Sequence, residues 1–245
     1  MLEGFWKLTW VETKIFLREP MGVVGTFVIP VVLFVVLGRA FRGAQVETGS
    51  AAETPFNLAI FTGLLIAVGA VASLVAIISI YREGGILKRL RATPLSPVTI
   101  LGAHVFIKLV FTAITLGLLV LAGRRVLPGA MDVSLPSFTA ALLLSTLSIL
   151  SLGFVIASVV PTARFAQPLS ALLLYPMIAM SGLFFPLEMM SLPLNILALT
   201  FPTTHAVSLM QGIWDGTGWD LGSTAALVVV FGVCTALSTR VFRWE

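Results

Sequence analysis

FNLAIFTGLLIAVGAVASLVAIISIY, residues 56–81, contains no charged residue and is followed directly by a basic segment. An α-helix rises about 1.5 Å per residue, so about 20 apolar residues cross the ~30 Å hydrocarbon layer of a bilayer. Inside hydrocarbon the backbone must satisfy its own hydrogen bonds, which leaves only helices and closed barrels. Barrel strands alternate polar and apolar residues, and this stretch does not. It therefore predicts a membrane-spanning helix.

Five further stretches are apolar and of membrane-spanning length, and the one at 98–123 includes His104 and Lys108. The additional predicted spans are residues 21–38, 98–123, 137–160, 167–185 and 221–239. Only 11% of the 245 residues are charged, against about 25% in soluble proteins, and so little charge cannot cover a water-facing surface. A soluble protein with a large apolar core is therefore disfavoured. The sequence predicts one all-α integral membrane domain over residues 1–245, with six transmembrane helices.

The basic residues predict how this domain is oriented. Six spans place both termini on one side, and the segments on that side hold eleven of the 15 Lys and Arg residues. The other four are Arg39, Arg42, Arg124 and Arg125. Because Lys and Arg concentrate in cytoplasmic loops, both termini are expected in the cytoplasm. This bias also explains the basic pI of about 9.7 without a nucleic-acid partner.

Residues 1–20 predict an interfacial helix on the cytoplasmic face. Charged residues share one face of this helix, while Trp and Phe side chains occupy another, as in helices that lie along a membrane surface. Pro20 is expected to end it. A simple extension of the first span is the alternative.

Two outer segments are expected on the opposite side. Residues 39–56 are polar, without a pattern, and predict an outer loop. In 186–205 the apolar runs are too short to cross and are broken by Pro186, Pro193 and Pro202, which favours a re-entrant hairpin in the outer leaflet. An ordinary extracellular loop is the alternative, although such a loop should be more polar.

The segment YREGGILKRLRATPLSP, residues 81–97, predicts a short cytoplasmic helix. Ile86, Leu87 and Leu90 fall at helical spacing, with basic residues on the other faces, and prolines at 94 and 97 stop the helix. Amphipathic helices of this kind dock in grooves of partner proteins. The alternative is that the cations only fix the topology.

Several motifs that other functions require are missing from the sequence, and their absence narrows the range of possible functions. There is no phosphate-binding loop, so ATP hydrolysis is not expected in this chain, and no catalytic motif or metal-ligand cluster is expected either. The six predicted spans contain no Asp or Glu, the usual ion relays of secondary transporters. His104 and Lys108 lie one turn apart in the third span, where a lysine usually extends to the interface. A permease driven by a separate ATPase subunit fits this pattern.

The chain also resembles a known family. Residues 81–97 closely resemble the signature of type-2 ABC exporter permeases, the group that includes daunorubicin-resistance and nodulation-factor export permeases. GLFFPLE at 182–188, PTTH at 202–205 and the region 12–20 are similar to further hallmarks, in the same order. The resemblance implies export by two permeases, identical or related, and two copies of a nucleotide-binding ATPase that hold ATP and Mg²⁺. It also implies that the hairpin closes the outer end of the pathway.

By this resemblance, a coupling helix would contact the ATPase. Its residues are Arg82, Glu83, Leu87, Lys88, Arg89, Leu90, Arg91 and Thr93. A substrate pathway along the interface between the two permeases is expected to use scattered polar and aromatic residues. These are Phe27, Asn57, Ser73, Tyr175, Ser181, Glu188 and His205.

The expected substrate is an amphiphilic drug, lipid or glycolipid-like molecule. Seventeen Phe against two Tyr is a poor composition for stacking sugars along a polysaccharide pathway. The expected location is the cytoplasmic (inner) membrane of a prokaryote. A membrane-embedded enzyme acting on lipids and an ATPase-independent carrier remain alternatives. The enzyme would need clustered acidic or His residues, and the carrier would work without a partner.

Overall fold

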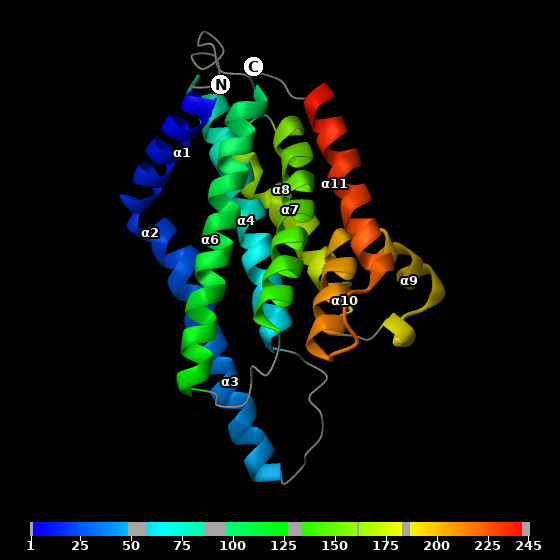
Figure 1. The fold of residues 1–245 in the computed structure, drawn as a ribbon. Coiled ribbons are helices and arrows are strands. Elements are labelled where there is room, and N and C mark those ends of the chain that lie inside the picture. Colours follow the sequence, from blue (N-terminus) through cyan, green and yellow to red (C-terminus); the bar gives the residue numbers. More distant parts are fainter. Residues whose placement is uncertain are drawn as a thin grey trace.

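The computed structural model describes residues 2–48, 58–85, 97–126, 134–160, 162–182 and 187–241. The described part is a bundle of helices without a strand, which confirms the all-α class (Figure 1). The elements in order are α1 (Leu2–Leu17), α2 (Pro20–Val23), the π-helical turn η1 (Val24–Val28), α3 (Ile29–Thr48), α4 (Leu58–Glu83), α6 (Pro97–Val126), α7 (Leu135–Val159), α8 (Ala163–Ala179), the 3₁₀ turn η2 (Leu187–Met189), α9 (Leu192–Leu199), α10 (Pro202–Trp214) and α11 (Leu221–Val241).

Five helices of the described part are long and apolar enough to cross a bilayer. Their apolar stretches are Pro20–Arg39, Gly63–Glu83, Gly102–Gly123, Leu135–Ser158 and Leu221–Ser238. Each overlaps a span predicted from the sequence.

The fifth predicted span, 167–185, differs. Helix α8 begins earlier, at Ala163, and ends at Ala179 after 17 residues, or about 25 Å. Gly182 follows with a φ of 85°, a conformation that no continuing helix adopts. Alone, α8 is therefore shorter than the hydrocarbon layer.

The helix of the first span, whose apolar stretch is Pro20–Arg39, continues beyond the predicted span. Residues 39–48 were expected in an outer loop, but α3 continues without a break to Thr48, so this part of the prediction is wrong. The segment RAFRGAQVET contains no proline, and Ala, Arg, Gln and Glu are good helix formers. Extending an existing helix costs far less than starting one, so polarity alone does not end it.

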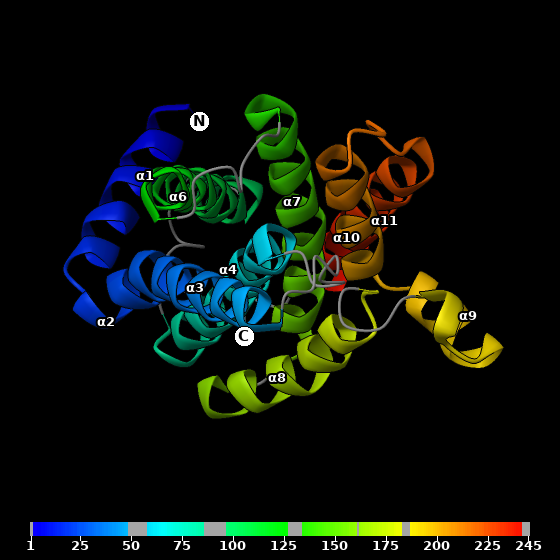
Figure 2. The same cartoon turned by 90° about the horizontal axis from the view of Figure 1, so that it is seen from below.

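Helix α7 is the centre of the bundle. It packs against α4, α10, α11 and α6, whereas α1 packs on the far side of α6 and α3 packs against both α6 and α4 (Figure 2). Small residues allow the close contacts. A Cβ added at Gly153 of α7 would lie 2.9 Å from Cγ1 of Val71 on α4. The Ser148 hydroxyl donates a hydrogen bond of 3.0 Å to the Leu227 carbonyl of α11.

The hairpin region 186–205 contains the short helix α9 and the first turn of α10. Pro193 and Pro202 each lie in the first turn of a helix, α9 and α10, where proline is well tolerated. The Thr204 hydroxyl donates to the Ala198 carbonyl at the end of α9, and Thr203 donates to Met177 of α8. Helix α10 is buried against the bundle, and α9 exposes Leu192 and Ile196. The depth of this hairpin in a bilayer stays a prediction.

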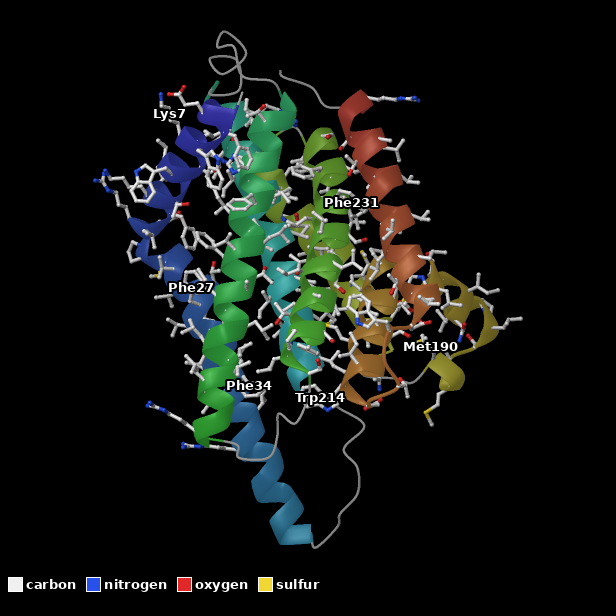
Figure 3. All side chains as sticks on the ribbon, viewed as in Figure 1. Lys7, Phe27, Phe34, Met190, Trp214 and Phe231 are labelled. Carbon is white, nitrogen blue, oxygen red and sulfur yellow. The ribbon has the colours of Figure 1, made fainter. Side chains whose placement is uncertain are left out.

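The bundle has two distinct ends. The start of α1, the end of α4, the start of α6 and the end of α11 lie together at one end (Figure 1). Trp214, at the end of α10, lies at the opposite end from Lys7 of α1 (Figure 3). The first end is the one predicted to face the cytoplasm, and this assignment stays a prediction.

Candidate functional site

A polar cluster lies where α1 packs against α6, close to the last turn of α4. The Tyr81 hydroxyl of α4 donates a hydrogen bond of 2.6 Å to Oε1 of Glu12 on α1. His104 of α6 places Nε2 4.0 Å from the same oxygen, and its ring lies edge-on to Tyr81 with 5.7 Å between centroids. Glu12 and His104 are 8% and 3% exposed. The cluster thus joins three helices within the protein.

Local helix geometry explains how these side chains meet. Glu12 lies on the opposite face of α1 from the stripe of Glu3 and Lys7, and it is buried together with Thr9. His104 and Lys108 are four residues apart and therefore share one face of α6. An amphipathic α1 must pack one face on the bundle, and Glu12 lies on that face.

Burial raises the pKa of the Glu12 carboxyl above its ordinary value, and the Tyr81 hydrogen bond and the charge of Lys108 oppose this only in part. A buried carboxyl that kept no donor would be costly. The Tyr81 hydroxyl therefore stabilises the position of α1 against the end of α4, which directly precedes the basic segment.

Two residues of the predicted coupling set lie in the last turn of α4. Arg82 points inward, and its Nη1 donates to the carbonyl of Val160 at the end of α7. Its Nε and Nη2 are buried and have no partner among the described residues. Glu83 is exposed. The remaining six, Leu87, Lys88, Arg89, Leu90, Arg91 and Thr93, lie outside the described residues.

Lys108 is a buried cation within the apolar stretch of α6. It is 5% exposed, and no carboxylate oxygen of the described residues lies within 4.0 Å of its ammonium group. The Phe16 ring lies over it, with its centroid 5.6 Å from Nζ. A cation–π contact contributes up to about 2 kcal/mol, whereas a Lys in the centre of a bilayer costs about 2.5–3.5 kcal/mol. The aromatic contact offsets only part of such a cost.

Lys108 lines a cavity of about 430 Å³. The wall is formed by Phe16, by the segment from Glu19 to Pro30 that includes η1, by α4, and by Phe111 and Thr112 of α6. Sites for small molecules are commonly about 300–1,000 Å³ in volume, mostly apolar, with a few polar groups. Buried ionisable groups in membrane segments usually face a cavity or a pathway. This cavity, with Lys108 in its wall, is therefore the candidate binding site.

The predicted pathway residues do not come together. Ser73 lines the cavity of Lys108. Phe27, which is labelled in Figure 3, instead packs edge-on against Phe16 and Phe111 and borders a neighbouring apolar cavity of about 360 Å³. Tyr175 is 67% exposed on the outside of α8.

The other predicted pathway residues belong to the hairpin side of the bundle or lie outside the described part. Ser181 is buried and donates to the Ile178 carbonyl, and Nε2 of His205 lies 3.0 Å from the Leu199 carbonyl. Glu188 belongs to η2. Asn57 lies outside the described residues. A pathway through all seven therefore stays a prediction.

The sequence contains signals that mark Glu12, His104 and Lys108 as buried polar residues, although it does not show that they lie together. Glu12 is a carboxylate on the apolar side of an amphipathic helix, and such a residue needs a buried partner. The spacing of His104 and Lys108 places them on a common face. That Tyr81 meets Glu12 could not be foreseen, because the two residues lie 69 positions apart in the chain.

Comparison with known proteins gives one family match and two similar curated proteins. Residues 3–214 match the family described as "ABC-2 type transporter". The chain is 31% identical over 142 residues to the "Inner membrane transport permease YhhJ" of Escherichia coli (strain K12) and, equally, to the protein of that name of Shigella flexneri. These matches cover 57% of this chain and only 38% of each relative.

Proposed function

We propose that this chain, which belongs to the ABC-2 type transporter family, is the permease subunit of an ATP-driven exporter that relies on a separate ATPase. The observation that carries the proposal is the family match over residues 3–214, which includes the polar cluster and the Lys108 cavity. The five membrane-length helices agree with a transporter subunit that passes several times through a membrane.

The ATPase is expected to dock at the end of the bundle where α1 begins and α4 ends. Three features support this. The segment 86–96 holds Lys88, Arg89 and Arg91 in a predicted amphipathic helix. The turn before it is anchored inward by Arg82, and Tyr81 joins that turn to Glu12 of α1. A push on segment 86–96 would thus reach α1, α4 and α7 together.

The working complex would contain two permeases, identical or related, and two ATPase subunits, with ATP and Mg²⁺ held by the ATPases. Closure of the ATPase pair would bias the paired bundles between inward- and outward-open states. The substrate would be an amphiphilic drug, lipid or glycolipid-like molecule. The location would be the inner membrane of a prokaryote, in keeping with the name of the similar permeases.

Affinity purification of the tagged chain in mild detergent, with identification of its partners, tests the proposal. We expect an ATPase to co-purify and to be lost in the double charge reversal Arg89→Glu and Arg91→Glu. The matched control is Arg124→Glu with Arg125→Glu, which reverses two charges at the opposite end of α6 and should keep the ATPase.

A chain that purifies without any ATPase would contradict the proposal. That outcome would favour a carrier that works alone or an enzyme acting on lipids. Retention of the ATPase by both double variants would contradict the docking role of segment 86–96.

A further inference from the structure

We propose that the cavity between η1, α4 and α6 binds the anionic headgroup, a phosphate or a carboxylate, of an amphiphile in the bilayer, with Lys108 as its counter-ion. The inference needs a membrane-embedded chain, which the family membership supports. It does not depend on coupling to an ATPase.

The cavity is hollow because its walls carry small side chains. Gly22 and Gly25 line one wall, and Gly69, Ala72 and Ala76 line the α4 wall. A Cβ added at Gly25 or Gly69 would meet no other atom within 4 Å. The free space therefore exists at the backbone itself and does not depend on the rotamer of a long side chain.

Lys108 is the cation that lines this space, and no carboxylate oxygen of the described residues forms an ion pair with it within 4.0 Å. The nearby carboxyl of Glu12 already accepts the Tyr81 hydroxyl and lies beside His104. Glu19 also lines the cavity, but no ion pair within 4.0 Å joins it to Lys108. An ammonium group offers three donors, and the described residues accept none of them. A phosphate or carboxylate oxygen at this point would supply the missing charge and the missing acceptors.

The shape of the cavity favours an amphiphile over a free anion. Its rim includes exposed Ile80, and Gly25 and Gly69 are also exposed. These rim residues belong to membrane-length apolar stretches. A ligand would therefore enter from the lipid side with its chains outside and its headgroup at Lys108. Lysine binds phosphate as a point charge, which suits a headgroup held at one end.

Equilibrium binding to the purified full-length chain in neutral detergent tests this inference. The probe is a fluorescent single-chain alkyl phosphate, compared with the alkyl phosphocholine of equal length. We expect the phosphate probe to bind the unmodified chain at least about tenfold more tightly than the phosphocholine probe. Lys108→Gln should remove that preference. A tenfold change in Kd corresponds to about 1.4 kcal/mol.

Two variants make the result specific. Gly69→Leu adds a side chain to the cavity wall and leaves Lys108 unchanged, and it should weaken binding of the phosphate probe to a similar extent. Arg125→Gln removes one positive charge from the exposed far end of α6 and should leave binding unchanged. If Lys108→Gln does not yield a monodisperse protein, two other variants replace it in the test. Lys108→Arg keeps the charge and should keep binding of the phosphate probe, whereas Gly69→Leu should weaken it.

The same preparations distinguish the source of the headgroup. An anionic phospholipid found by mass spectrometry in the unmodified chain and lost in Lys108→Gln would identify a membrane lipid. Probe binding without any retained lipid would point to a transported amphiphile. Equal probe binding by the unmodified chain and Lys108→Gln, or full competition by inorganic phosphate alone, would overturn the inference. Because no ATPase is present, loss of ATPase coupling would leave these outcomes unchanged.

Discussion

At the scale of single residues, the buried polar groups near one end of the bundle work as connections between helices. Tyr81 joins α4 to α1, Arg82 joins α4 to α7, and each of these bonds reaches across the chain rather than along one helix. Replacing one partner of such a bond leaves the other buried without a hydrogen bond, which costs about 1–3 kcal/mol. These connections are therefore expected to be visible in stability measurements.

Tyr81→Phe tests the first connection. The change removes only the hydroxyl that donates to Glu12, so the buried carboxyl loses its 2.6 Å hydrogen bond. We expect a loss of about 1–3 kcal/mol, seen as a lower thermal midpoint of the detergent-purified chain. Tyr175→Phe is the matched control, because Tyr175 is 67% exposed and should tolerate the change. Equal midpoints for the two variants would show that the Glu12 contact contributes nothing.

At the scale of helices, α7 determines the packing, and its small residues set how closely α4 can approach. Gly153→Ala would place a Cβ 2.9 Å from Cγ1 of Val71, which overpacks the α4–α7 contact. Such overpacking typically costs about 1–3 kcal/mol. Gly232→Ala in α11 is the control, because a Cβ there meets nothing within 4 Å. In a helix interior Ala is about 1 kcal/mol more favourable than Gly.

We therefore expect opposite shifts of the thermal midpoint, downward for Gly153→Ala and upward or unchanged for Gly232→Ala. A stabilised Gly153→Ala would mean that α4 and α7 lie further apart than described.

The helices also show how far the sequence determines the fold. Long apolar stretches predicted α4, α6, α7 and α11 within a few residues, because hydrocarbon allows little else. The ends of α3 and α8 were missed. Nothing in the polar segment 39–48 stops a helix. Helix α8 ends at Ala179, shortly before Gly182 turns the chain and before the predicted apolar stretch is complete. The Glu12–Tyr81 bond and the Lys108 cavity depend on how helices pack, which a single sequence does not record.

At the scale of the whole molecule, α8 and the following hairpin decide the topology. The start of α1 and the end of α11 lie at the same end of the bundle (Figure 1). The described residues contain five membrane-length helices, an odd number. A return of the chain to that side therefore needs one more crossing, which we predict for α8 with its hairpin. Pro168 and Pro176 lie inside α8 and make it an irregular helix. We therefore expect the sixth crossing to be shared between this short helix and the hairpin.

Accessibility of single cysteines tests this topology. Cys234 is first replaced by Ser, and then Glu3→Cys, Arg240→Cys and Asp215→Cys are introduced one at a time at exposed positions. With a membrane-impermeant thiol reagent, Glu3→Cys and Arg240→Cys should be labelled only in inside-out vesicles, and Asp215→Cys only in intact spheroplasts. Labelling of Glu3→Cys and Arg240→Cys from opposite sides would mean that α8 and its hairpin do not cross. The two ends of the described bundle would then not correspond to the two faces of the membrane, and segment 86–96 would lose its assignment to the ATPase side.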